Sequence, residues 1–254
     1  MTEVEFLAVC LEEGWFAGPD EDFAAFEKRV RAMKEWLADP RPLEKLLKHP
    51  IGVEKHHSRL FLCRTGGRKK SWWHGALTWL HPISPHLIVP VLELPAKFRW
   101  VGREELLAHE GVHVSRSMFK EPVFEEIIAF RTSEKRWRRL LGPLLSGDME
   151  AGALFIAAAF PPFAVLIGAP FWISHLPWIG LLFGWGVRLF KRQSLFHRAF
   201  KRMELFSSRP ETAIALLTDR EIIGLAGGIL PELGTLPRQR QLRLMLDKCR
   251  EKSG

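Results

Sequence analysis

One short motif holds most of the chemistry that can be read from this sequence of 254 residues. His109 and His113 stand four positions apart, and Glu110 directly follows the first histidine, which is the pattern HExxH. Because residues four apart share one face of a helix, both imidazoles can bind the same Zn²⁺ ion. Glu110 would lie beside that ion as the general base for an attacking water. The motif therefore predicts zinc-dependent hydrolysis, usually of peptide bonds.

A catalytic zinc site uses three protein ligands and keeps one position open for water. The segment FEEIIAF, residues 124–130, offers Glu125 and Glu126. It lies in a second helix that we expect to begin at Pro122 and to end near Gly142. Both glutamates follow the two histidines in the chain, so either could complete the site, and the residues alone leave that choice open.

Residues 103–133 resemble the gluzincin zinc peptidases, whose active-site helix bears HExxH and whose third ligand is a Glu on a later helix. The resemblance implies the two histidines as ligands and Glu110 as the base. It favours Glu126 as third ligand, because Ala129 follows three residues later, as in the ExxA pattern of membrane zinc peptidases that process prenylated or damaged membrane proteins. Glu125 is the alternative. The resemblance also implies a sheet whose edge strand holds substrate beside the metal.

Two departures from that family pattern concern residues around the metal. Phe130 stands where the family usually has an Asp, so another group must orient the ligating histidine. The chain has no Tyr, so an oxyanion would need a His or Arg donor. The candidates for that donor are Arg116, Arg131, His175 and His197.

The elements expected to position the motif form a small α+β domain. Apolar residues spaced three and four apart predict an amphipathic helix over residues 21–39. Residues 59–64 and 72–80 are predicted to form a β-hairpin. The apolar run 87–94 contains Pro90, which indicates an edge strand or an irregular rim segment because proline has no amide hydrogen to donate. The resulting zincin-like domain would combine a small mixed sheet with the active-site helix.

Residues 151–187 contain no Lys, Arg, Asp or Glu. This stretch exceeds one membrane span of ~20 residues and suffices for two short ones, so it predicts a transmembrane helical hairpin, with a re-entrant hairpin as the alternative. Basic residues flank it on both sides, which places the bulk of the chain in the cytoplasm. The net charge of +8 and the 10 Trp and 18 Phe without Tyr favour an anionic lipid surface. We therefore expect an integral membrane protein.

Three regions follow from these patterns. Residues 1–148 are expected to form the zincin-like metallopeptidase domain, residues 149–190 the membrane hairpin of two short helices, and residues 191–254 a basic region of C-terminal helices. The basic residues of the last region lack the interleaved aromatics or the fold of a nucleic-acid reader, so no nucleic-acid partner is expected. The expected partners are a protein or peptide substrate and membrane lipid, and the sequence leaves the oligomeric state open.

Two other interpretations compete with a membrane-anchored zinc peptidase. The first is a membrane-anchored interaction protein whose metal site is structural or vestigial, which the missing Asp and Tyr favour. The second is that HExxH arises by chance and that its helix and the next simply pack as core. In that case Glu110, Glu125 and Glu126 would be exposed and would not converge on the histidines.

Overall fold

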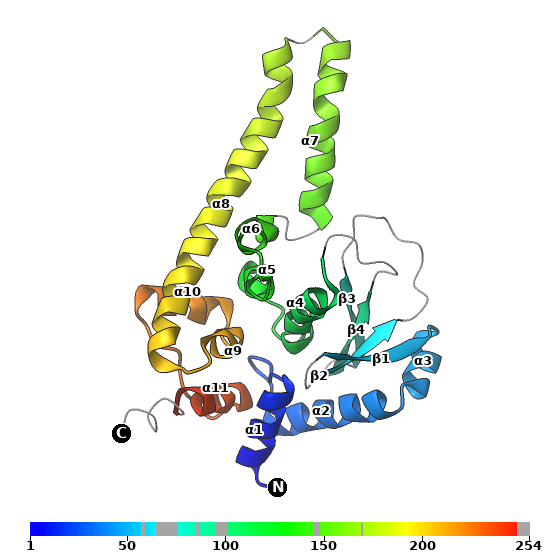
Figure 1. Ribbon diagram of the computed structural model, residues 1–254, viewed down its shortest axis with the longest axis vertical. Coiled ribbons are helices and arrows are strands. Elements are labelled where there is room, and N and C mark those ends of the chain that lie inside the picture. The colour runs from blue at the N-terminus through cyan, green and yellow to red at the C-terminus, as the bar shows by residue number, and fades with distance from the viewer. Residues whose placement is uncertain are drawn as a thin grey trace.

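The computed structural model describes residues 1–56, 59–64, 76–84, 87–94, 101–144, 148–168 and 170–247. Figure 1 shows a body of helices around a small sheet, from which α7 and α8 project as a long hairpin. The elements are α1 (Glu3–Glu13), α2 (Phe23–Ala38), α3 (Arg41–Leu47), β1 (Ile51–His56), β2 (Arg59–Arg64), β3 (Leu77–Ser84), β4 (Leu87–Glu93), α4 (Arg103–Ser115), α5 (Pro122–Arg131), α6 (Arg136–Leu141), η1 (Gly142–Leu144), α7 (Asp148–Leu166), α8 (Phe171–Phe206), α9 (Pro210–Ala215), α10 (Asp219–Gly227) and α11 (Pro237–Asp247).

The four strands form one mixed sheet in the order β1-β2-β4-β3. The antiparallel pairs are β1 with β2 and β3 with β4, whereas β2 and β4 are parallel. The hairpin expected from residues 59–64 and 72–80 is therefore wrong, because β2 and β3 are not neighbours. Residues 72–75 of that expectation lie outside the described residues.

The edge position expected for the run with Pro90 is also wrong, because β4 lies between β2 and β3. The pairing explains how the strand accepts this proline. β2 pairs only with Leu92 and Glu93 of β4, whereas Pro90 faces Leu80 of β3. At Pro90 the ladder therefore runs on one side only, and the missing amide hydrogen breaks no bond toward β2.

Helices cover both faces of the sheet. On one face Leu62 and Val91 pack with the apolar residues of α1 and α2. On the other face Phe61 and Leu92 pack against Leu107 of α4. This alternation along β2 and β4 follows from the period of two in a strand, and it holds the HExxH helix directly against the sheet.

The C-terminal helices share one apolar core with α5 and the inner half of α8. Arg116, which follows α4 and is 1% exposed, joins this core to the active-site helix. Its guanidinium donates to the carbonyls of Ala215 at 2.7 Å and Leu217 at 2.9 Å. At the start of α5, the Asp219 carboxylate accepts from the backbone amide of Val123 at 2.9 Å. The connection between α4 and α5 is thereby fixed to the C-terminal helices on both of its sides.

No helix among the described residues is long and apolar enough to cross a membrane. This finding corrects the transmembrane hairpin expected over residues 149–190, and with it the integral membrane protein. The physical reason is the division of the uncharged stretch. In α7 it begins after Glu150 and ends at Leu166, and in α8 it ends at Arg188, so each arm falls short of the ~20 apolar residues of a span.

The second arm of the hairpin is not a short helix, because α8 continues through residue 190 into the body. Its two halves differ in exposure. Phe183 and Phe190 are 72% and 75% exposed, whereas Phe196 and Phe200 are 1% and 2% exposed. The residues of α8 that join the C-terminal core, such as Phe196 and Phe200, therefore belong to its inner half.

Candidate metal centre

The α4–α5 helix pair brings the predicted metal ligands together. The Nε2 atom of His109 lies 3.7 Å from Oε2 of Glu126, and Nε2 of His113 lies 3.5 Å from Oε1 of the same carboxylate. The ligand atoms of these three residues all lie within 4.8 Å of one another. Zinc bonds of about 2.0–2.1 Å in a tetrahedron separate neighbouring ligand atoms by roughly 3.4 Å. The three side chains therefore fit a Zn²⁺ ion after a small inward movement.

The two glutamates of FEEIIAF have different places in this site. Glu126 faces both histidines, whereas Glu125 accepts a hydrogen bond from Nδ1 of His113 at 2.7 Å. That bond turns Nε2 of His113 toward Glu126. A carboxylate on the outer nitrogen is the usual support of a metal-binding imidazole. Glu125 thus supplies the orienting group that Phe130 cannot supply.

His109 is oriented by the helix that follows, through backbone and packing contacts. The backbone of Ala129 lies near this ring and favours its protonated form. The ring also lies edge-on against Phe130, with 4.5 Å between the ring centroids. Phe130 therefore packs against a candidate ligand and limits the orientation of its ring.

Burial and neighbouring charges separate the pKa values of the two histidines. Burial, with the charges of His113 and Arg138, lowers the pKa of His109 to about 3, so this ring is neutral as a metal ligand must be. Burial alone would also lower the pKa of His113, but the hydrogen bond that His113 donates to Glu125 and the charge of Glu126 raise it to about 9. A protonated His113 therefore balances the two carboxylates, and a divalent cation at this place would take over that role.

Glu110 leaves α4 toward the sheet and is 5% exposed. Its Oε2 accepts a hydrogen bond from the Thr78 hydroxyl at 2.5 Å. Burial raises the pKa of this carboxyl above its ordinary value, against the lowering effects of the His113 charge and the Thr78 bond. A buried Glu110 beside two histidines that share a carboxylate is not the exposed, divergent arrangement expected of an accidental motif.

Two residues near the centre were not singled out from the sequence. Thr78 lies on β3, the edge strand, and brings that edge to Glu110. Arg138, assigned from the sequence to the basic flank of the hairpin, lies close enough to His109 for its charge to lower the pKa of that ring. Its guanidinium pairs with Glu105 at 2.6 Å.

A helix break brings Arg138 to this place. The helix expected from Pro122 to near Gly142 divides into α5 and α6. At the break the Thr132 hydroxyl donates to the Ala129 carbonyl at 2.7 Å. Such side-chain bonds to the local backbone compete with helix continuation. The Thr-Ser pair at 132–133 was therefore the sequence feature that could have predicted the helix break.

The four candidate oxyanion donors lie elsewhere. Arg116 donates through Nη1 to backbone carbonyls of the C-terminal helices, while its buried Nε and Nη2 have no hydrogen-bond partner among the described residues. Arg131 lies 4.0 Å over the ring of Phe200. His175 is on the projecting part of α8, beside Ser174 at 2.9 Å, and His197 is exposed on the same helix. The charge of Arg138 lowers the pKa of His109, and Arg116 interacts electrostatically with Glu125.

No known protein-family model, curated protein or solved structure matches this chain. The resemblance to gluzincins therefore depends on the HExxH motif and the glutamates after it. The geometry described above is independent support for a metal site at these residues, because side-chain distances were not part of the motif.

Proposed function

We propose that this chain is a zinc-dependent metallopeptidase. The observation that supports this most is the convergence of His109, His113 and Glu126, with Glu110 buried beside them. Two imidazoles and one carboxylate are a donor set found in hydrolytic zinc enzymes. The fit of their separations to a tetrahedral site adds to that chemistry.

In this proposal His109, His113 and Glu126 would hold the zinc ion. When bound, the ion would lower the pKa of a water molecule and polarise the carbonyl of the scissile bond. Glu110 takes the proton of the attacking water and later passes it to the leaving amine. The raised pKa of Glu110 suits this exchange, because a carboxylate that accepts a proton more readily is a better base near neutral pH.

The neighbouring elements favour a peptide as the substrate. β3 is an edge strand of the described sheet, and its Thr78 contacts Glu110. An extended peptide can add to such an edge through backbone hydrogen bonds, which would place one of its carbonyls beside the metal ligands. Arg138 is then the cation best placed to stabilise the negative charge that develops on that carbonyl.

Zinc content and proteolysis test the proposal together. Tag-free wild type and His113→Ala would be reconstituted with zinc and measured by elemental mass spectrometry. We expect about one zinc per chain in the wild type and little in the variant. Only the wild type should cleave an unfolded protein substrate, and a chelator should stop that cleavage. Absence of zinc from the reconstituted wild type, or cleavage that persists in the variant, would overturn the proposal.

An interaction protein with a structural metal site is the second candidate. The large apolar side chains exposed on α7 and α8, such as Phe155 at 64% and Phe183 at 72%, favour it, because such surfaces commonly mark contact sites. It differs from the first candidate in one respect that can be measured. Zinc would bind and stabilise the fold, but the chain would cleave no peptide bond.

A further inference from the structure

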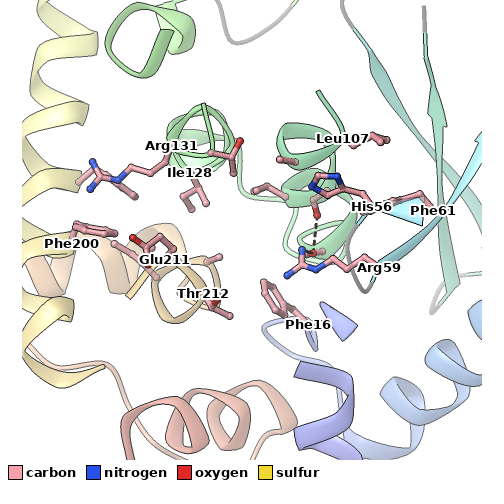
Figure 2. A pocket seen from close by; sticks show the side chains of 18 residues that line it. Phe16, His56, Arg59, Phe61, Leu107, Ile128, Arg131, Phe200, Glu211 and Thr212 are labelled. Atoms are coloured by element: carbon pink, nitrogen blue, oxygen red, sulfur yellow. Dashed lines mark hydrogen bonds between the residues drawn. The ribbon is translucent and has the colours of Figure 1, made fainter. Parts of the chain in front are cut away.

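A cavity of about 310 Å³ lies behind the α4–α5 helix pair. Gly111 and Ser115 of α4 and Ile128 of α5 line it. Each of these residues is two positions beyond a candidate metal residue, which is about 200° around a helix. The cavity is therefore on the opposite face of the helix pair from the metal site. Figure 2 shows it between the strands with α4 on one side and α8 with α9 on the other.

The inner wall of this cavity is apolar and well packed. It is formed mainly by Phe16, Phe61, Leu107, Ile128 and Ile214, each at most 5% exposed. The volume is at the lower end for small-molecule sites and is equivalent to about ten water molecules at ~30 Å³ each. An apolar group of about eight to twelve carbon atoms would fit it.

Arg59 of β2 is the charged group at one end of the cavity. Its Nη1 donates a long hydrogen bond of 3.4 Å to the Ser115 hydroxyl, and no carboxylate of the described residues forms an ion pair with it. Burial lowers its pKa, and the charge of Arg209 acts in the same direction. Arg209 is itself paired with Glu12 at 2.8 Å. Arg59 is thus a partly desolvated cation, and most of its donors have no hydrogen-bond partner among the described residues.

Arg131, the cation at the other end of the cavity, has interaction partners within the protein. Arg131 lies 4.0 Å over the Phe200 ring, and the charge of Glu211 opposes the lowering of its pKa by burial. Figure 2 shows Arg59 reaching from the strand side toward α8 and α9, with Arg131 and Glu211 across the cavity. An anion would therefore gain more at Arg59, where it would meet no fixed carboxylate.

We propose that this cavity binds a small amphipathic carboxylate of the fatty-acid class. The carboxylate would pair with Arg59, whose planar guanidinium can donate two parallel hydrogen bonds. The alkyl chain would lie between Phe16, Phe61 and Ile128, where its burial supplies the hydrophobic part of the affinity. The site is separate from the metal centre and does not depend on the proposed peptidase activity.

Titration calorimetry with decanoate, below the concentration at which it forms micelles, tests the site. We expect one saturable site per wild-type chain. Decanol, which has the chain without the charge, and decyltrimethylammonium, which has the opposite charge, should each bind at least about tenfold more weakly. Butanoate, which has the head without the chain, should show no measurable binding. Equal affinity for decanoate and decanol would overturn the proposal, and so would absence of saturable decanoate binding.

Two matched arginine variants locate the carboxylate. Arg59→Gln should weaken decanoate binding by about tenfold or more and leave decanol binding unchanged, because only the charged hydrogen bonds are removed. Arg131→Gln, at the opposite end, should change decanoate affinity less than about threefold. Adsorption to the exposed apolar side chains of α7 and α8 would be insensitive to both changes. Equal effects of the two variants would therefore overturn the assignment.

A third variant keeps the test valid if Arg59→Gln fails to fold, which circular dichroism would show. Thr212→Trp, at a half-buried lining position of α9, places an indole in the cavity and leaves Arg59 in place. It should abolish decanoate binding, since the space for the alkyl chain is filled. Undiminished binding in a folded Thr212→Trp variant would mean that the ligand lies elsewhere.

Discussion

The two faces of the α4–α5 helix pair carry different kinds of site. On the metal face, the side chains have partners within the protein: Glu125 hydrogen-bonds His113, Thr78 hydrogen-bonds Glu110, and the Phe130 ring packs against His109. On the cavity face the wall is apolar, and Arg59 has a single long bond to a hydroxyl.

This difference suits the metal face to a chemical reaction and the cavity face to ligand binding. Groups that react must be held in place before substrate arrives, and the surrounding bonds do this on the metal face. On the cavity face most donors of Arg59 have no partner among the described residues, so a ligand that enters could bind them in place of water. The two faces should therefore respond independently to mutation, and that independence can be tested.

The largest expected effect is the loss of catalysis on the metal face in Glu110→Gln. The amide cannot take a proton from water, so kcat for peptide cleavage should fall by roughly 10²–10⁴-fold. Zinc content should stay at the wild-type level, because Glu110 is not a proposed ligand. Decanoate binding on the cavity face should not change. Glu134→Gln, at an exposed position between α5 and α6, is the matched control and should keep full activity.

A smaller effect distinguishes the two glutamates within the metal face. Glu126→Gln should weaken zinc binding strongly because it removes a proposed ligand charge, whereas Glu125→Gln removes only the support of His113 and should cost about 10–100-fold in affinity. Competition with a chelating dye measures both dissociation constants. If Glu125→Gln lost more zinc affinity than Glu126→Gln, the roles of the two carboxylates would be exchanged.

The pH dependence of zinc affinity tests the role of His113 on the metal face. A pKa of about 9 means that the metal-free protein keeps the proton on His113 up to that pH, and zinc must displace it. The dissociation constant should therefore fall about tenfold per pH unit between pH 7 and 9 and level off above it. Glu125→Gln removes a carboxylate charge that helps to raise this pKa, so its curve should level off at a lower pH. Decanoate binding at Arg59 should not change over this range.

The metal face could be predicted from the sequence because its residues lie close together in the chain. The metal face comes from residues three and four apart on one helix and from the glutamates on the next, so helical periodicity places them together. What periodicity did not give was the separate place of Glu125. That depends on the angle between α4 and α5, which is set by packing against the C-terminal helices.

The cavity face could not be predicted because its lining comes from distant parts of the chain. Phe16, Arg59 and Ile214 meet only after the sheet and the C-terminal helices have packed. The same holds for Thr78, which reaches Glu110 because β3 pairs with β4 instead of β2. Strand order depends on such long-range pairing, and local apolar patterns do not determine it.

The prediction of a transmembrane hairpin was wrong for another reason. The expectation was based on the total length of residues 151–187, whereas crossing a bilayer depends on the length of each continuous helical arm. The structure divides the stretch at the turn after Leu166. It also extends α8 into the core through Phe196 and Phe200, which the sequence had placed in a separate region.

The smallest expected effect concerns the contact between α4 and the sheet. A Cβ added at Gly111 would lie 3.2 Å from Cζ of Phe61, whereas one added at Gly224 of α10 meets nothing closer than 3.7 Å. Replacing a helical glycine by alanine normally stabilises by about 0.8–1 kcal/mol. Gly224→Ala should gain most of that amount in denaturant unfolding, and Gly111→Ala should gain less because the Phe61 ring must shift. An equal gain in both variants would mean that the α4–sheet contact is loose, and the cavity beside it would then be deformable instead of preformed.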